Sequence, residues 1–174
     1  EITYGDWSSD VCSSDLARYC ASDDKEFYPR TDAAVIVLVK DKQDRILLGR
    51  QSSWPKGRFS TFAGFVEAGE SFESAVEREV FEECGVRSQE IHYLGSQPWP
   101  FPASIMVAFE IEAENPDVAR ADGIEIEQVA WFTRKELLDA VSSGEILLPP
   151  EISIARRMIE NWYGARLLGG EAWR

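Results

Sequence analysis

Residues 64–86, which read GFVEAGESFESAVEREVFEECGV, contain seven glutamates and a single arginine, a net of six negative charges. We expect a helix over residues 71–84 within this segment. Glu70 and Glu73 suit the positive N-terminal end of such a helix, and Gly85 suits a left-handed C-terminal cap. A loop, a helix and a concentration of carboxylates are therefore predicted together.

Three of the glutamates, Glu79, Glu82 and Glu83, are spaced i, i+3 and i+4, so they share one arc of the predicted helix. Like charges at this spacing repel, and a divalent cation such as Mg²⁺ or Mn²⁺ would relieve the repulsion. Gly64 and Gly69 would let the preceding loop turn tightly against the helix. The alternative is a charged helix face exposed to solvent.

The spacing favours the metal site. The segment fits the pattern G-x5-E-x7-R-E-U-x-E-E-x-G-U, where U is aliphatic, at nine positions: Gly64, Glu70, Arg78, Glu79, Val80, Glu82, Glu83, Gly85 and Val86. This pattern resembles the Nudix box. The resemblance implies an α/β fold, an α/β/α sandwich with a mixed β-sheet. It also implies metal-assisted attack of water on the diphosphate of a nucleoside derivative.

The same resemblance implies roles for the charged residues. Glu79 and Glu83 would bind the metal directly, and Glu82 would bind it or position the attacking water. Arg78 and Glu70 would hold the loop against the helix as an ion pair. The alternative for Arg78 is an ordinary surface arginine, because exposed ion pairs are weak.

A second motif, SQPWPFPAS, occupies residues 96–104. Its three prolines predict a rigid loop outside the sheet. Trp99 and Phe101 would offer flat surfaces to a base or ribose beside the polar Gln97 and Ser104. From chemistry alone, a proline-stiffened loop that buries two aromatic rings is an equal alternative.

This second motif resembles the S-Q-P-W-P-F-P-x-S signature of the NADH pyrophosphatase family. The resemblance implies that the whole motif binds substrate, namely Gln97, Pro98, Trp99, Pro100, Phe101, Pro102, Ala103 and Ser104. It adds Tyr28, Phe65 and Ala155 as further substrate contacts, and Ala63 (through its carbonyl) and Glu125 as further metal ligands. Without it, Glu125 would be taken for a surface carboxylate before a strand.

Between these motifs the apolar patterning predicts a mixed sheet covered by helices. The expected strands are 35–39 and 46–48, paired as a hairpin, then 59–65, 91–97, 105–111 and 126–132. Further helices are expected over 133–143 and 151–162.

Residues 1–27 show no lasting periodicity, and the stretch 8–16 looks like translated sequencing adapter. We expect a disordered or foreign leader before a catalytic domain of residues 28–174. Family members usually carry a four-cysteine zinc ribbon here, of which Cys20 keeps the third position, but Asp23 stands at the fourth. Structural zinc is therefore not expected. Cys84 is expected to be a buried apolar residue, and the lone His92 is assigned no catalytic role.

The composition limits the partners. With 31 acidic and 18 basic residues the net charge is −13, which argues against a broad basic face for nucleic acid or anionic membranes. No apolar run approaches the ~20 residues of a membrane span. Three cysteines suggest no disulfide framework, which favours the cytoplasm. The family resemblance also implies a homodimer.

The combined prediction is a Mg²⁺- or Mn²⁺-dependent enzyme that splits NADH or NAD⁺ into AMP and nicotinamide mononucleotide, with removal of NAD caps from RNA as a further activity. Three alternatives stay open. They are hydrolysis of another nucleoside diphosphate derivative such as ADP-ribose, a binding module without turnover, and an inactive fragment.

Overall fold

The computed structural model describes residues 18–20, 22, 24–28 and 30–168, in two compact units that divide between Thr31 and Asp32. In the first unit, β1 (Arg18–Cys20) and β2 (Lys25–Phe27) pair as antiparallel strands. The sequence predicted no regular structure there, so for these strands the prediction was wrong. The predictions for residues 1–17 and for Asp23 lie outside the described residues.

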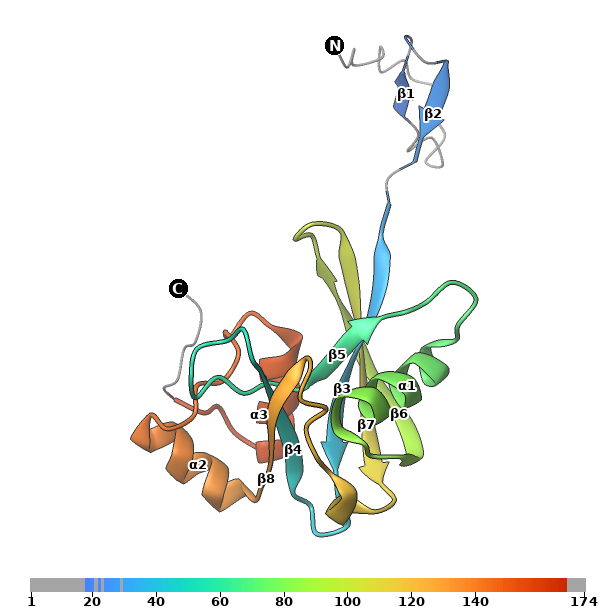
Figure 1. Ribbon diagram of the computed structural model, residues 1–174. Coiled ribbons are helices and arrows are strands. Elements are labelled where there is room, and N and C mark those ends of the chain that lie inside the picture. Colours follow the sequence, from blue (N-terminus) through green and yellow to red (C-terminus); the bar gives the residue numbers. More distant parts are fainter. Residues whose placement is uncertain (1–17, 21, 23, 29, 169–174) are drawn as a thin grey trace. The chain divides into compact units, whose positions relative to one another are not determined.

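The second unit is built on a six-stranded mixed sheet (Figure 1). Its strands are β3 (Asp32–Lys40), β4 (Ile46–Gln51), β5 (Phe62–Phe65), β6 (Ser88–Trp99), β7 (Ser104–Ala113) and β8 (Ile126–Phe132). The order is β6-β7-β3-β4-β8, with β5 paired to β3. Only β3 and β7 run parallel; the other pairs are antiparallel. The predicted mixed sheet is confirmed.

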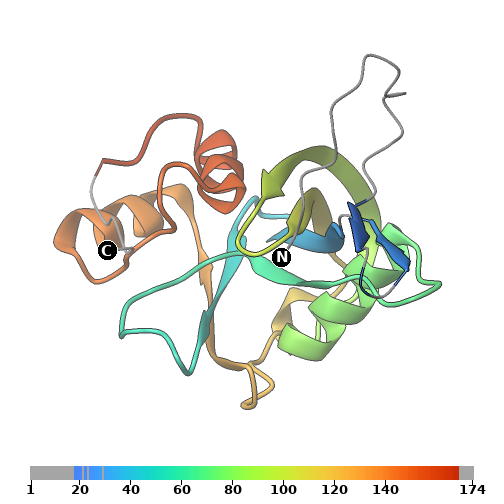
Figure 2. The ribbon, with the colours of Figure 1, turned by 90° about the horizontal axis from the view of Figure 1, so that it is seen from above.

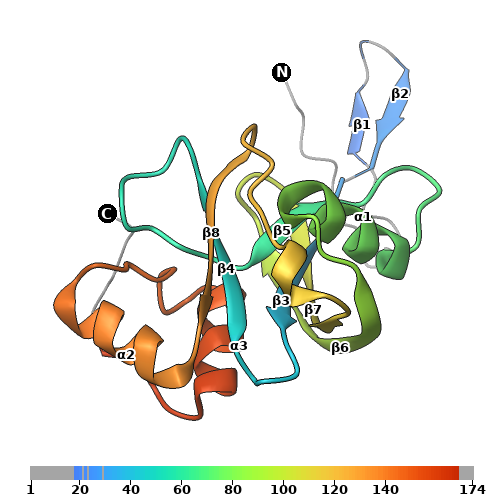
Figure 3. The ribbon, with the colours of Figure 1, turned by 60° about the horizontal axis from the view of Figure 1, so that its bottom comes forward.

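Central strand β3 is buried on both faces, and its side chains alternate between two cores. Val35, Val37 and Val39 pack with α1 (Phe72–Cys84). Ile36 and Leu38 pack with α2 (Arg134–Ser143) and α3 (Ile154–Tyr163) on the other face. Figure 3 shows the strands lying between these two groups of helices. Because the side-chain period of a strand is two, one apolar run supplies both cores and produces the predicted α/β/α sandwich.

Capping groups set the helix ends. Ser71 precedes α1 and its side chain accepts a hydrogen bond from the Ser74 backbone, while Gly85 ends the helix at φ 73°. Both ends agree with the prediction within one residue. Helix α3 begins three residues later than predicted, because Ser153 is its N-cap and its backbone N–H closes a turn onto Pro150.

The second motif is mostly strand, which corrects the prediction of a loop. β6 continues through Trp99, and Pro98 and Trp99 lie opposite Ile105 and Ser104 of β7. Pro98 is tolerated in β6 because β6 is an edge strand, so one side of its backbone needs no partner strand. Only residues 100–103 form the turn to β7.

One edge of β3 is shared by two strands. β5 pairs with residues 34–37 of β3, whereas β4 pairs only with Val39 and Lys40. Along its whole length β4 also pairs with β8. A short 3-10 helix (Pro116–Val118) lies in the connection that precedes β8. The sheet therefore opens between β4 and β5. No helix in the described part of the chain is both long and apolar enough to cross a membrane.

Candidate active site

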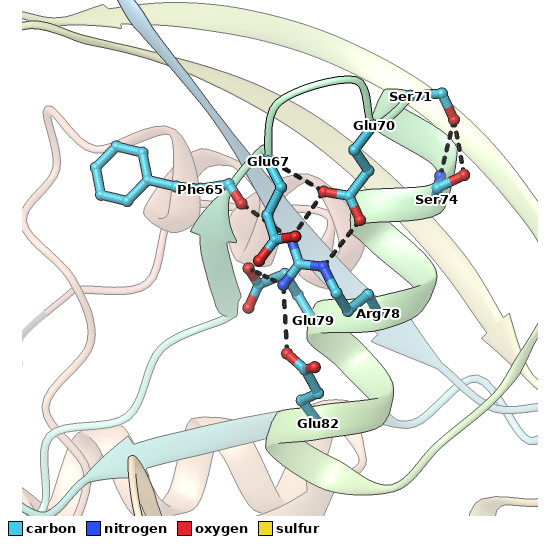
Figure 4. A network of polar contacts seen from close by, with 8 residues as sticks. All are labelled: Phe65, Glu67, Glu70, Ser71, Ser74, Arg78, Glu79 and Glu82. Carbon is cyan, nitrogen blue, oxygen red and sulfur yellow. Dashed lines mark hydrogen bonds and ion pairs between the residues drawn. The ribbon is translucent and has the colours of Figure 1, made fainter.

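Arg78 of α1 is the centre of a polar network between the helix and the loop before it (Figure 4). Its Nε and Nη2 atoms each donate to one oxygen of the Glu70 carboxylate at 2.8 Å, and Nη2 also donates to the Phe65 carbonyl at 3.0 Å. Nη1 donates to Glu79 Oε1 at 2.8 Å and to Glu82 Oε2 at 3.3 Å. The ion pair expected between Arg78 and Glu70 is present.

These contacts fix the loop by charge. The Arg78 hydrogen bonds, with a smaller contribution from the Glu67 backbone N–H, lower the pKa of Glu70 to about 2. The same pair raises the pKa of Arg78 further above its usual value. A bidentate guanidinium–carboxylate pair is directional as well as strong, so Arg78 is a positioning residue and no ordinary surface arginine.

Gly64 on β5 makes room for the carboxylate of Glu79. A Cβ atom on Gly64 would stand 1.9 Å from Glu79 Cδ and 2.0 Å from Oε1. Burial raises the pKa of Glu79, although the hydrogen bond from Arg78 opposes this shift. The glycine of the first motif is therefore required for direct contact between the strand backbone and a helix carboxylate.

Glu83 lies on the apolar face of α1, beside Val76 and Val80, and is only 4% exposed. A backbone N–H from Ala63 hydrogen-bonds its carboxyl group, yet Oε2 is buried with no hydrogen-bond partner among the described residues. Burial first, and then the negative charges of Glu79 and Glu125, raise the pKa of Glu83 to about 8. A buried carboxylate oxygen without a partner is costly unless a cation or proton satisfies it.

Glu125 approaches this pair from the connection before β8. Asp122 accepts hydrogen bonds from the backbone N–H groups of Glu125 and Ile126, at 3.1 and 2.8 Å, and Gly123 takes φ 75°. The charge of Glu125 raises the pKa of both Glu79 and Glu83. The tight turn therefore holds a third carboxylate within electrostatic range of the first two.

This oxygen-only donor set fits a hard divalent cation, and the unpartnered Glu83 oxygen is the observation that supports the fit. Within residues 18–168 as described, no three His, Cys, Asp or Glu side chains already converge as a metal-binding group. Arg78 instead holds the carboxylate of Glu79. The Glu82 side chain is 59% exposed and lies on the solvent side of the helix. Metal binding by Glu82 and by the Ala63 carbonyl stays a prediction.

A cavity of about 420 Å³ opens where β4 and β5 diverge, and Glu83 forms part of its wall. Five residues predicted for the site lie around it: Ala63, Glu83, Gln97, Trp99 and Ala155. Its remaining lining is mostly apolar and was not predicted: Ile36, Gly49, Gln51, Trp54, Ser60, Thr61, Met106, Ile126, Pro149, Pro150, Ser153 and Ile154. These residues come from six segments, and no local pattern in the sequence links them.

Gln97 joins two walls of the cavity. Its side-chain carbonyl accepts a hydrogen bond from the Ile154 N–H at 2.8 Å, and its amide nitrogen donates to the Ile152 carbonyl at 2.7 Å. Figure 2 shows the β6–β7 hairpin beside α3, which these contacts connect. The amide of Gln97 therefore positions the start of α3, a role that the sequence did not predict.

Other residues predicted to bind substrate lie outside the cavity lining: Phe65, Pro98, Pro100, Phe101, Pro102, Ala103 and Ser104. Phe101 is 74% exposed and packs edge-to-face against Trp99, with ring centroids 5.7 Å apart. Tyr28 belongs to the first unit, where its hydroxyl donates to Glu26. Their contacts with substrate stay predictions. Cys84 is fully buried, as expected, and His92 hydrogen-bonds the exposed Glu90.

The model of the NUDIX domain family matches residues 29–151, which is well over half of the chain. The chain belongs to the Nudix family. A Nudix hydrolase from Nitrosomonas europaea has the same fold, with a TM-score of 0.63 over 86% of this chain and 82% of that chain. The two sequences are 22% identical, so this likeness supports the Nudix fold alone.

Curated relatives are more similar in sequence. A Mycobacterium bovis protein named NAD-capped RNA hydrolase NudC is 50% identical over 79% of this chain and 46% of its own length. The NAD-capped RNA hydrolase of Schizosaccharomyces pombe is 45% identical over 76% of this chain and 38% of its own length. The resemblance to the NADH pyrophosphatase group of Nudix proteins is therefore confirmed. The chain spans less than half the length of these relatives.

The buried Nudix-box carboxylate predicts how the stability of the metal-free protein depends on pH. The pKa of Glu83 is about 8 in the folded state and near 4.5 in an unfolded chain, so the folded state binds the extra proton between these values. The contribution of Glu83 to the free energy of unfolding is therefore fully present below pH 4.5 and is lost as the pH rises towards and through 8. In EDTA we expect Tm to fall by about 5–10 °C between pH 5.5 and 8.5.

Thermal unfolding at pH 5.5, 7.0 and 8.5, with and without Mn²⁺, measures this effect. Mn²⁺ should restore Tm most strongly at pH 8.5, where Glu83 is ionised. The variant Glu83→Gln should flatten the metal-free profile, because it cannot titrate. A metal-free profile with the same slope in Glu83→Gln would show that another group causes the loss.

Proposed function

We propose that this chain hydrolyses the diphosphate of NADH or NAD⁺, yielding AMP and nicotinamide mononucleotide, with Mg²⁺ or Mn²⁺ as cofactor. The observation that carries the proposal is Glu83, which has a buried carboxylate oxygen without a partner among the described residues and which lines an apolar cavity together with Trp99 and Ala155. The part of the cavity near the charged Glu83 suits a metal-bound diphosphate. The apolar rest of the lining suits a flat base. The names of the curated relatives support an NAD-derived substrate.

Glu79 and Glu83 of α1, with Glu125 before β8, are the residues that would hold the metal, because their carboxylates lie within electrostatic range of one another. A bound divalent cation supplies positive charge that binds the diphosphate, lowers the pKa of a water and stabilises charge on the leaving phosphate. Attack of water on phosphorus breaks one P–O bond, and the departing phosphate oxygen leaves as part of the other mononucleotide.

The protein's own groups provide position and charge. Arg78 fixes the loop carrying Glu67 and Glu70 through contacts of 2.8–3.0 Å. We propose that Glu82, on the solvent side of α1, accepts the proton of the attacking water or orients that water. Trp99 would stack on the base at the apolar end, and Gln97 would keep that wall closed by holding Ile154.

The test is metal-dependent release of AMP. Wild-type protein incubated with NADH, NAD⁺ or ADP-ribose and Mn²⁺ is expected to release AMP fastest from NADH or NAD⁺, and EDTA should abolish the release. Chromatography of the products measures both. The matched control is Glu77→Gln, which removes an exposed glutamate of the same helix and should keep wild-type rates.

Each alternative has a distinct outcome in this assay. Faster release of AMP from ADP-ribose than from NADH would show that the preferred substrate is another nucleoside diphosphate derivative. Binding of NAD⁺ without release of AMP would indicate a binding module. Full activity in EDTA would overturn the metal assignment.

We also propose NAD-capped RNA as a substrate, since the curated relatives are named for it. The net charge of −13 disfavours long contacts with the RNA backbone, so recognition would be limited to the cap. A cytoplasmic location and a homodimer remain part of the proposal. Gel filtration of the purified chain measures the second.

A further inference from the structure

Thr61 carries a buried hydroxyl group with no hydrogen-bond partner among the described residues. The residue is 6% exposed and is one of the residues that line the cavity, as Glu83 is. Neither of the two sequence motifs, residues 64–86 and 96–104, includes it. Since most buried side-chain polar atoms in proteins have a partner, this hydroxyl needs a specific explanation.

The backbone around Thr61 is held on both sides. Ser60 exchanges two backbone hydrogen bonds of 2.9 Å with Gly49 of β4, and Phe62 pairs with Val37 of β3. Thr61 thus lies between a backbone pairing with β4 and a backbone pairing with β3. A threonine fixed in this way cannot turn its hydroxyl to solvent by a small movement of the loop, because the pairing on either side would break.

The chemistry of the cavity indicates what the hydroxyl meets. The other residues that line the cavity are mostly apolar, including Ile36, Met106 and Ile126. Apolar walls with a few placed polar groups bind a flat ligand and fix its orientation by the polar groups. A hydroxyl both donates and accepts, so it suits an amide or amino group on the edge of a heteroaromatic base.

We propose that Thr61 is a specificity-determining residue whose hydroxyl hydrogen-bonds the amide or amino edge of the substrate base. This inference rests on the proposed function, since it places the base of a dinucleotide in the cavity. Two groups of NAD⁺ share this chemistry, the carboxamide of nicotinamide and the amino group of adenine. A hydroxyl left without its partner rejects bases that lack the matching group.

The experiment compares Thr61→Val, which is close in shape and lacks the hydroxyl, with Thr61→Ser, which keeps it. With Mn²⁺ and NAD⁺ we expect Thr61→Val to raise KM about 5- to 20-fold while kcat changes less than about twofold, and Thr61→Ser to keep KM within about twofold. The thermal stability of the free protein should change in the opposite sense to substrate binding. Thr61→Val should raise the Tm of the free protein by about 2–4 °C, and Thr61→Ser should lower it.

Two analogues distinguish the groups. One is nicotinic acid adenine dinucleotide, which lacks the carboxamide, and the other is nicotinamide hypoxanthine dinucleotide, which lacks the adenine amino group. Thr61→Val should reduce the wild-type preference for NAD⁺ over one of them. An unchanged KM in Thr61→Val, or an equal rise of KM in Thr61→Ser, would overturn the proposal. Either result would show that the hydroxyl forms no hydrogen bond that contributes to substrate binding.

A binding measurement separates this inference from the proposed function. Calorimetry in EDTA gives the Kd of AMP and of nicotinamide mononucleotide without turnover. Weaker binding of one mononucleotide to Thr61→Val, by about fivefold or more, supports the role of Thr61 even if no AMP is released from any dinucleotide. Equal Kd values for wild type and Thr61→Val with both ligands would overturn it.

Discussion

Replacing Glu83 by glutamine is expected to lower the turnover of NADH by about 10²–10³-fold, since a metal contributes several kcal/mol of transition-state stabilisation and each 1.4 kcal/mol is tenfold. Glutamine keeps the shape of the side chain but removes the charge from the buried oxygen that has no partner in the described structure. The affinity for Mn²⁺ should fall together with turnover. Initial rates of AMP release and Mn²⁺ titration measure the two effects.

The fold should survive this change. Glu83 is 4% exposed and its pKa is raised by burial, so the folded protein already favours a neutral group at this position. Metal-free Glu83→Gln should therefore unfold at or above the wild-type Tm at pH 8. Glu77→Gln, on the exposed face of α1, should leave both turnover and Mn²⁺ affinity at wild-type values. Wild-type turnover in Glu83→Gln would refute the metal assignment.

Replacing Gly64 by alanine is expected to reduce turnover by about 10–100-fold or more, the range seen when groups that orient metal ligands are changed. The added methyl group would lie 1.9 Å from the Glu79 carboxyl carbon, so that carboxylate must move. The atoms that must move are at the end of a side chain rather than in the backbone. The loss of stability should therefore be small compared with the loss of activity.

A double-mutant cycle with Glu79→Gln tests whether Gly64 acts through Glu79. If displacement of this carboxylate causes the loss, Gly64→Ala should add little to the loss already present in Glu79→Gln. Rates of AMP release and Tm for the four proteins complete the cycle. Additive losses in turnover would show that the methyl group acts elsewhere, and a large drop in Tm would show that it disturbs the pairing of β5 with β3.

The elements of the fold were largely readable from the chain because their signals are local. The run Val35–Val39 is apolar throughout, and Ser71 and Gly85 bear the capping chemistry of the two ends of α1. These preferences depend on neighbours within a few residues. The prolines of residues 96–104 misled the prediction, because a proline excludes a central strand but not an edge strand, and edge position is a property of the whole sheet.

The candidate site divides in the same way. Arg78 and Glu70 are eight residues apart, and a glycine-rich loop followed by a helix is enough to bring them together. Glu79, Glu82 and Glu83 have nearly equal standing in the sequence, yet their surroundings differ: Glu83 is buried, Glu79 lies against Gly64, and Glu82 is exposed. Helical spacing alone does not determine which side of α1 packs against the sheet. Nor does it determine how deeply each glutamate is buried.

By itself, the sequence determined the loop–helix carboxylate segment, the mixed sheet between helices and the membership of the Nudix family. Only the tertiary structure decided which carboxylate is buried without a partner, that Gln97 holds the start of α3, and that Thr61, whose buried hydroxyl has no partner among the described residues, is one of the residues lining the cavity. The physical reason is that burial and hydrogen-bond satisfaction depend on all segments packed around an atom. Here those segments come from strands, helices and loops, and the lining residues Ile36 and Ala155 are 119 positions apart in the sequence.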